Sequence, residues 1–212
     1  MNHKIKYERA KKNLIQAGMK LTFLYDQNTR TQIIYNGIYL DELVGEIIAW
    51  HFCPSEEKHL WFKSLIFRTG ELSFSKKIDI LKEILKHSYP DIFDATRGLI
   101  ERLHEIRRMR NDFAHSELII NESKLLENFG KPPKGICLRS IKKGGMTEAF
   151  YSEADMKEQI KLAGEVGLFV QYVYAEVKNR VTGGTKNFEP LLKIFKRQSP
   201  HVLKNPTKPK KV

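Results

Sequence analysis

A polar run, Arg110-Asn111-Asp112-Phe113-Ala114-His115, holds two side chains that can act on a phosphodiester. Arginine stays positively charged at every physiological pH, and histidine gains or loses a proton near neutral pH. Cleavage of RNA without a metal ion needs such a fixed cation and such a proton acceptor. The residue types therefore make Arg110 and His115 candidates for ribonuclease chemistry.

The spacing of this run is not distinctive by itself, because Arg97 precedes His104, and Arg108 precedes His115, at similar separations. The surrounding apolar pattern sets Arg110 apart. On a long predicted helix, apolar residues recur every seven positions, at Ile92, Leu99, Ile106 and Phe113. A second row with the same spacing lies next to it and contains Thr96, Leu103 and Arg110. A cation in an apolar row is costly unless it is paired. We therefore expect Arg110 either to meet a buried acid or to face a cleft that receives an anion.

Ideal helical geometry separates Arg110 from His115. Five residues at about 100° each place the two side chains roughly 140° apart around the helix axis, whereas Asn111 shares the face of His115. Either the helix bends or frays near Ala114, or the site combines helices from two subunits. For His115 alone, the simpler interpretation is a favourable interaction of its protonated ring with the helix C-terminus.

Helical periodicity dominates the rest of the chain. Apolar stripes and end signals predict helices over residues 5–24, 34–50, 55–70, 73–87, 91–116 and 152–182. Two short strands around Gly144-Gly145 predict a β-hairpin, which must pack on the helices because an isolated hairpin is marginally stable. The predicted fold is all-α, a helical bundle of about six helices with a small β-hairpin insertion at residues 136–151.

Positive charge is concentrated at the two ends of the chain. The formal net charge is +12, of which residues 1–20 supply +5 (six bases, one acid) and residues 193–212 supply +7 (seven bases, no acid). Basic ends suit a polyanion such as nucleic acid, although solubilising termini explain the tail equally well. The predicted division is a basic N-terminal helix (1–30), the helical bundle with its hairpin (31–182), a short amphipathic segment (183–198) and a basic disordered tail (199–212).

The sequence indicates a cytoplasmic protein with no membrane segment. The most apolar stretch, residues 33–52, is interrupted by Asp41, Glu42 and Glu46, which a bilayer span would not tolerate. The N-terminus has charge but no following apolar region, so no secretion signal is visible.

The cysteines and nearby histidines give little support for a disulfide or a metal site. Cys53 and Cys137 lie far apart without paired spacing. His51, Cys53 and His59 are possible metal ligands, but a second close pair is missing. A helix junction is therefore favoured over a zinc site.

A helical bundle in which a late helix ends in Arg-polar-x-x-x-His resembles the HEPN superfamily. Its members are small helical proteins, and many are metal-independent endoribonucleases of toxin–antitoxin and phage-defence systems. The resemblance covers roughly residues 30–180. It is most marked at residues 72–78 and 107–115, and only the second stretch is specific.

The resemblance implies a cofactor-free, metal-free ribonuclease acting as a homodimer, whose two motifs face each other across a cleft. His115 would accept the proton of a ribose 2′-hydroxyl, Arg110 would stabilise charge on the phosphate, and Asn111 would orient the phosphate or His115. The products would carry a 2′,3′-cyclic phosphate and a 5′-hydroxyl, and DNA would resist cleavage.

Further expectations concern RNA contacts and partners. The basic residues expected to bind RNA are Arg107, Arg108, Lys142 and Lys143, and a toxin would also imply an antitoxin or regulatory protein. Asp112 could pair with an arginine, but exposure to solvent is the favoured expectation. Glu117 stands where one subgroup commonly has a tyrosine, so regulation through that tyrosine is not supported. Because some members of the superfamily bind without cleaving, the alternative is a non-catalytic nucleic-acid-binding or regulatory module.

Overall fold

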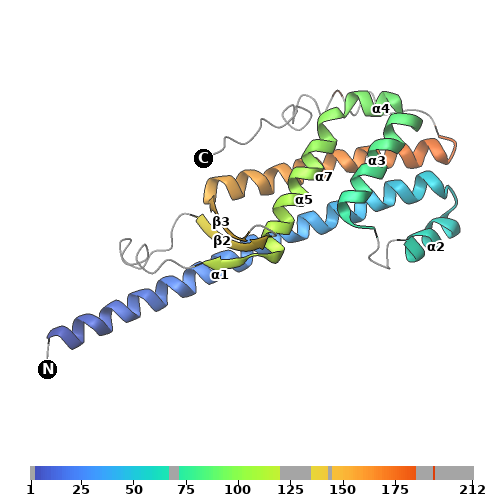
Figure 1. Cartoon of the computed structure of the whole chain (residues 1–212). Coiled ribbons are helices and arrows are strands. Elements are labelled where there is room, and N and C mark those ends of the chain that lie inside the picture. The colour runs from blue at the N-terminus through green and yellow to red at the C-terminus, as the bar shows by residue number, and fades with distance from the viewer. Residues whose placement is uncertain (1–2, 67–71, 120–134, 143–144, 185–192, 194–212) are drawn as a thin grey trace. The chain divides into compact units, whose positions relative to one another are not determined.

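The computed structural model describes residues 3–66, 72–119, 135–142, 145–184 and 193 (Figure 1). Most of these residues are helical. The helices are α1 (His3–Phe52), α2 (Glu56–Ile66), α3 (Phe74–Ser88), α4 (Pro90–Ala95), α5 (Arg97–His115) and α7 (Glu153–Val181). The strands β1 (Glu117–Ile119), β2 (Gly135–Lys142) and β3 (Gly145–Ser152) form one antiparallel sheet in the order β1-β2-β3. The predicted helical fold with a small β-hairpin is confirmed.

The chain forms two compact units that are interleaved along the sequence. One unit contains residues 1–34 and 109–160, and the other contains residues 35–108 and 161–212. Helices α1, α5 and α7 each contribute residues to both units. The division predicted from the sequence stays a prediction, and its C-terminal segment (183–198) and tail (199–212) lie largely outside the described residues.

Several of the predicted helix ends are fixed by local hydrogen bonds in the structure. Ser73 caps α3 by accepting from the Lys76 backbone amide at 3.4 Å. Ser152 and Asp155 form a reciprocal capping box at the start of α7, with the Asp155 amide donating to Ser152 Oγ over 3.1 Å and the Ser152 amide to Asp155 Oδ2 over 3.0 Å. Gly183, with φ of +86°, follows α7 in the conformation that ends helices.

Two predicted helix boundaries were wrong. The stripes at residues 5–24 and 34–50 lie on one continuous helix, α1. The helix expected over residues 91–116 is instead α4 and α5, separated at Thr96. The Thr96 hydroxyl donates a hydrogen bond to the Ile92 carbonyl over 2.7 Å. The Thr96 backbone amide donates to the Phe93 carbonyl, three residues back, instead of to the Ile92 carbonyl four residues back. This local bonding tightens the backbone and ends α4.

Each unit has its own apolar core. In the unit with residues 35–108, buried side chains from α1, α3, α5 and α7 form the larger cluster, which includes Leu40, Ile47, Leu81, Leu103 and Phe169. In the unit with the sheet, the smaller cluster comprises Ile33, Met109, Phe113, Ile136, Leu138 and Met156. Among the described helices, none combines the length and apolar character that a membrane span requires.

The sheet is slightly larger than the predicted hairpin. β2 and β3 pair in the predicted antiparallel manner, with Ile136 opposite Tyr151 and Lys142 opposite Gly145. The short β1, directly after α5, adds a third strand that pairs with β2. The sheet therefore begins two residues after His115.

Candidate functional site

The Arg110–His115 motif occupies the end of α5, whose last helical residue is His115. Ser116 then leads directly into β1. Phe113, in the middle of the motif, is fully buried, and Met109 one turn before it is also buried in the small core. The motif is therefore fixed to a packed helix end rather than to a loop.

Arg110 is half-buried and has a neutral partner. Its Nη1 donates a hydrogen bond to Asn111 Oδ1 over 2.9 Å, and its Nε is buried without a hydrogen-bond partner. Among the described residues, no carboxylate forms an ion pair with Arg110. A guanidinium bonded to an amide keeps its charge for an incoming anion. Arg110 was expected either to pair with a buried acid or to face a cleft that receives an anion. The described residues provide no such acid.

His115 is exposed at the helix end. Asn111 precedes it by one helical turn, on the same face. Because the guanidinium of Arg110 reaches Asn111, the arginine side chain extends toward the face that carries His115. No hydrogen bond joins Arg110 to His115 in the described region. The helix thus brings Arg110 and Asn111 together and leaves His115 a turn away.

A second arginine, which the sequence analysis missed, lies beside the motif. Arg30 of α1 donates from Nη2 to the Ser116 carbonyl over 2.6 Å. Ser116 is only 6% exposed, and the last carbonyls of a helix have no intrahelical donor. Arg30 therefore satisfies the backbone next to His115 and fixes the exit of α5. The two residues are 86 positions apart, so no local pattern could have revealed the contact.

The expectation that Asp112 faces solvent was wrong. Asp112 is half-buried, and its Oδ2 accepts a hydrogen bond from the Tyr151 hydroxyl over 3.2 Å. The Tyr151 ring also packs against Phe113, with ring centroids 5.1 Å apart. Burial, and then the charge and hydrogen bond of Asp112, raise the pKa of Tyr151 to about 12. This pair ties the motif helix to β3.

The predicted RNA-binding residues have different surroundings. Arg108 is exposed, whereas Arg107 is half-buried with its Nε lacking a hydrogen-bond partner. Both belong to the unit with residues 35–108, while Arg110 belongs to the other. Lys142 ends β2, and Lys143 lies outside the described residues. The sequence prediction for these four residues therefore stays a prediction.

The possible metal ligands His51 and His59 have separate partners. His59, buried at 4% exposure, bonds Glu46 Oε2 through Nε2 over 2.7 Å and stacks on Trp50. His51 Nδ1 lies 3.2 Å from the Tyr89 hydroxyl, and burial lowers the pKa of His51. Within the described residues, no group of three or more histidines, cysteines and acids could hold a metal ion.

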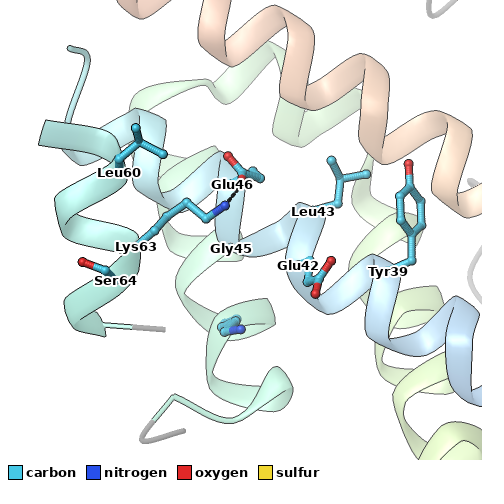
Figure 2. A pocket seen from close by; sticks show the side chains of 9 residues that line it. Tyr39, Glu42, Leu43, Gly45, Glu46, Leu60, Lys63 and Ser64 are labelled. Carbon is cyan, nitrogen blue, oxygen red and sulfur yellow. Dashed lines mark hydrogen bonds and ion pairs between the residues drawn. The ribbon is translucent and has the colours of Figure 1, made fainter. Parts of the chain in front are cut away.

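A cavity of about 650 Å³ opens between α1, α2 and α3, and no sequence pattern indicated it (Figure 2). It is lined by Tyr39, Glu42, Leu43, Gly45, Glu46, Leu60, Lys63, Ser64 and Lys77. Figure 2 shows Lys63 of α2 directed at Glu46 of α1, with which it forms an ion pair. Lys77 is paired with Asp41 over 2.7 Å. Both basic side chains of the cavity are therefore neutralised by acids.

Comparisons with protein-family models, curated proteins and solved structures find no match to this chain.

Proposed function

We propose that this chain is a metal-independent endoribonuclease of the HEPN type, which cleaves RNA at the Arg110–His115 motif. The supporting observation is the guanidinium of Arg110. It is held by Asn111, has a buried and unpaired Nε, and lacks a carboxylate partner among the described residues. Holding a cation in a half-buried position without a counter-charge is costly, and a bound phosphate would offset that cost.

The proposed reaction is transfer of a phosphodiester within the RNA strand. His115 takes the proton of a ribose 2′-hydroxyl, and the 2′-oxygen attacks the adjacent phosphorus. The bond between phosphorus and the 5′-oxygen breaks, and that oxygen takes a proton from water or from a second protonated histidine. Arg110 stabilises the charge on the non-bridging oxygens while Asn111 holds the guanidinium in place. The products are a 2′,3′-cyclic phosphate and a 5′-hydroxyl end.

The proposed biological setting is a cytoplasmic toxin or phage-defence effector that acts as a homodimer and is held in check by an antitoxin or regulatory protein. Three features support this setting. They are the likeness of the motif to HEPN ribonucleases, the helical fold that carries it, and the basic ends of a chain with net charge +12.

The test is cleavage of a labelled RNA in EDTA by the parent chain and by the variants Arg110→Ala, Asn111→Ala and His115→Ala. We expect the alanine variants of Arg110 and His115 to lose at least about a hundredfold in rate, the usual contribution of a proton-transfer or charge-stabilising group. The cleavage rate of Asn111→Ala should fall by less, because Asn111 only holds the Arg110 guanidinium in place. A DNA strand of the same sequence should remain intact.

Matched controls come from exposed charged residues of another helix. Lys82→Ala removes an exposed cation of α3, and His87→Ala removes an exposed histidine of the same helix. Both should keep the parent turnover rate. If folded Arg110→Ala and His115→Ala chains cut RNA as fast as the parent, the proposed function is wrong.

A second candidate function is a non-catalytic module that binds nucleic acid. The exposed position of His115, and the lack of a direct contact between His115 and Arg110 in the described region, favour it. It predicts that neutralising the basic ends abolishes RNA binding. It also predicts that RNA stays intact at every protein concentration, which the assay above would reveal.

A further inference from the structure

Strand β3 leaves one side of the sheet open. It is the last strand in the order β1-β2-β3, so among the described strands it has a neighbour on one side only. A strand at the edge of a sheet presents a row of unpaired backbone N–H and C=O groups. Residues 145–150 of β3 are all exposed. The open edge of β3 is therefore accessible to another strand.

The edge of β3 lacks the features that usually prevent such pairing. Natural edge strands are protected by lysine, by proline, by bulges or by a short length. β3 has eight residues, contains neither lysine nor proline, and pairs with β2 at eight consecutive positions without a bulge. The strand at the opposite edge, β1, has only three residues. The edge of β3 is thus suited to extending the sheet into a partner.

The sheet also has an outer face that is partly apolar. Ile136 and Leu138 are buried in the small core, so the residues that alternate with them lie on the opposite face of the sheet. The strand register gives this outer face as Glu117, Ile119, Cys137, Arg139, Ile141, Met146, Glu148 and Phe150. Ile141, Met146 and Phe150 are 88%, 63% and 57% exposed. Large apolar side chains gathered on one exposed face indicate a surface that binds another protein.

The sequence of β3 is nearly symmetric about Glu148. Met146-Thr147-Glu148-Ala149-Phe150 has a large apolar residue, a small residue, the acid, a small residue and a large apolar residue, in either direction. Two antiparallel copies centred on Glu148 would place Met146 of each copy opposite Phe150 of the other, on the outer face. A two-fold interface has such mutual contacts, in which residue i meets j and j meets i. The symmetry therefore favours a second copy of this chain as the partner.

The charges of the outer face are compatible with this pairing. Within each copy, Arg139 donates to Glu148 Oε1 from Nε over 3.2 Å and from Nη2 over 2.9 Å. The centred register places the two Glu148 carboxylates opposite each other, which alone would be unfavourable. Each carboxylate brings its own arginine, so the flanking cations offset the repulsion. The other acid of the row, Glu117, lies on β1, two strands from the joined edge.

We propose that two copies of this chain pair antiparallel through β3, with Glu148 at the two-fold axis, and join their three-stranded sheets into one sheet of six strands. Met146 and Phe150 of the two copies then cover each other. This inference rests on the proposed function for the need of two copies, and it assigns the surface where they meet. None of the motif residues Arg110, Asn111 and His115 belongs to that surface.

A cysteine cross-link tests the register, in a chain whose free cysteines, Cys53 and Cys137, are replaced by serine. Residues directly opposite each other in an antiparallel pair have Cα atoms about 4.5–5.5 Å apart, within reach of a disulfide. Glu148→Cys should therefore give a covalent dimer on oxidation, seen by non-reducing electrophoresis. Met146→Cys should stay monomeric in the same assay, because the two Met146 positions are four residues apart along the strands, roughly 14 Å. Equal cross-linking of both variants, or of neither, overturns the proposed pairing.

Sedimentation equilibrium of the full chain without RNA measures the strength of the interface. Met146→Lys should weaken association at least about tenfold, because each dimer loses two contacts with Phe150 and gains charge at the edge. The matched control is Leu168→Lys, the same change at a 54% exposed apolar residue of α7, and it should keep the parent dissociation constant. A monomeric parent, or a Met146→Lys chain that associates as tightly as the parent, overturns the interface. A parent that dimerises through β3 but leaves RNA intact in EDTA keeps the interface and rejects the ribonuclease.

Discussion

The hydrogen bond from Arg110 to Asn111 gives the arginine a defined position without neutralising its charge. An acid in place of Asn111 would hold the side chain equally well but would cancel much of its attraction for phosphate. Arg30 contributes differently, because it binds the Ser116 carbonyl and so fixes the backbone beside His115. Asn111 thus positions the charged group of the motif, and Arg30 fixes the backbone next to it.

At the residue scale, the contact with Asp112 predicts that the Tyr151 phenol loses its proton at an unusually high pH. Burial and Asp112 raise the pKa of Tyr151 to about 12, compared with 10.0 for an ordinary tyrosine. Stability gained from this raised pKa is fully present below pH 10 and is lost as the pH rises through about 12. In Asp112→Asn the pKa should fall but remain above 10, because the ring stays buried. The ultraviolet absorbance of tyrosinate after a rapid pH jump measures the change.

The contribution of Tyr151 to that absorbance is found by subtracting the signal of Tyr151→Phe, since the chain has eight tyrosines. An Asp112→Asn chain in which Tyr151 titrates as in the parent would show that Asp112 does not interact with the phenol.

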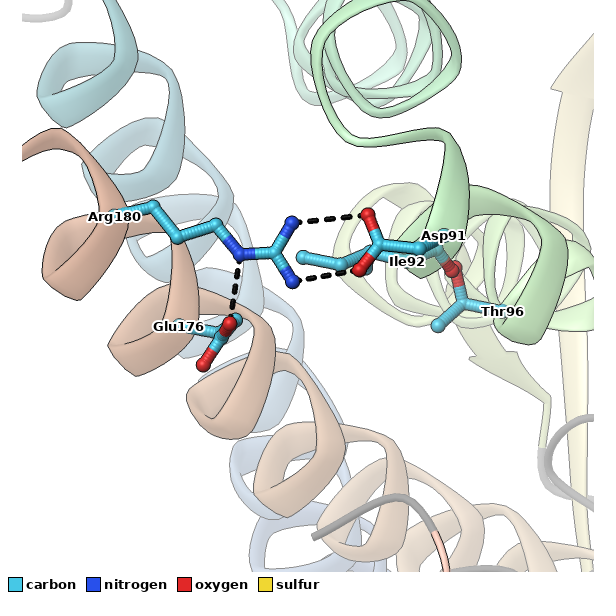
Figure 3. Close-up of polar contacts among 5 residues, drawn as sticks. All are labelled: Asp91, Ile92, Thr96, Glu176 and Arg180. Atoms are coloured by element: carbon cyan, nitrogen blue, oxygen red, sulfur yellow. Dashed lines mark hydrogen bonds and ion pairs between the residues drawn. The ribbon is translucent and has the colours of Figure 1, made fainter. Parts of the chain in front are cut away.

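At the element scale, a charged network joins α4 to α7 (Figure 3). Arg180 of α7 binds both carboxylate oxygens of Asp91 on α4, at 2.9 and 2.6 Å, and its Nε donates to Glu176 over 2.7 Å. Glu176 is only 2% exposed, and the guanidinium of Arg180 supplies it with a charged hydrogen bond. The arginine therefore connects a surface acid with a buried one.

Replacing Arg180 with methionine should destabilise the chain by about 3–5 kcal/mol at neutral pH, because it removes a charged hydrogen bond to the buried Glu176 and the two-pronged contact with Asp91. Urea unfolding measures this difference. Lys161→Met, which removes an exposed lysine of the same helix, should change stability by less than about 0.5 kcal/mol. A similar loss in both variants would contradict the role given to the network.

The same network should be sensitive to acid. The hydrogen bond and charge of Arg180 hold the pKa of Asp91 below its ordinary 3.8. The stability from this interaction is present above pH 3.8 and is lost as the pH falls through the folded-state pKa of Asp91. The stability gap between parent and Arg180→Met should therefore narrow below pH 4.

At the scale of the whole molecule, the proposed ribonuclease depends on two copies of a 24.7 kDa chain. If Arg110 of one copy works with His115 of the other, a mixed dimer of Arg110→Ala and His115→Ala chains keeps one intact site of two. Random mixing makes half of the dimers mixed, so about one quarter of the parent activity should return. Cleavage assays on the mixed, refolded variants measure this recovery.

Sedimentation of the parent supplies the matching control, because a dimer is needed for any recovery. A parent that sediments as a monomer while cleaving RNA would contradict the shared site, as would mixed dimers without activity.

The sequence by itself determined the helical class, most helix ends and the position of Arg110 at the edge of an apolar row. Those features depend on periodicity and on bonds between near neighbours, such as the Ser152 and Asp155 capping pair. The burial expected for the row is confirmed, since Ile92, Leu99 and Phe113 are fully buried, although Ile92 lies on α4 and the other two on α5. Arg110 is half-buried. Local physical chemistry therefore identified the candidate catalytic arginine.

Only the tertiary structure decided what surrounds that arginine. The Arg30 contact with Ser116 and the Tyr151 contact with Asp112 join residues 86 and 39 positions apart, and such pairings have no local sequence pattern. The same is true of the cavity beside α2, which needs side chains from three helices. Packing selects these neighbours, because a buried polar group must find its partner wherever the folded chain places one.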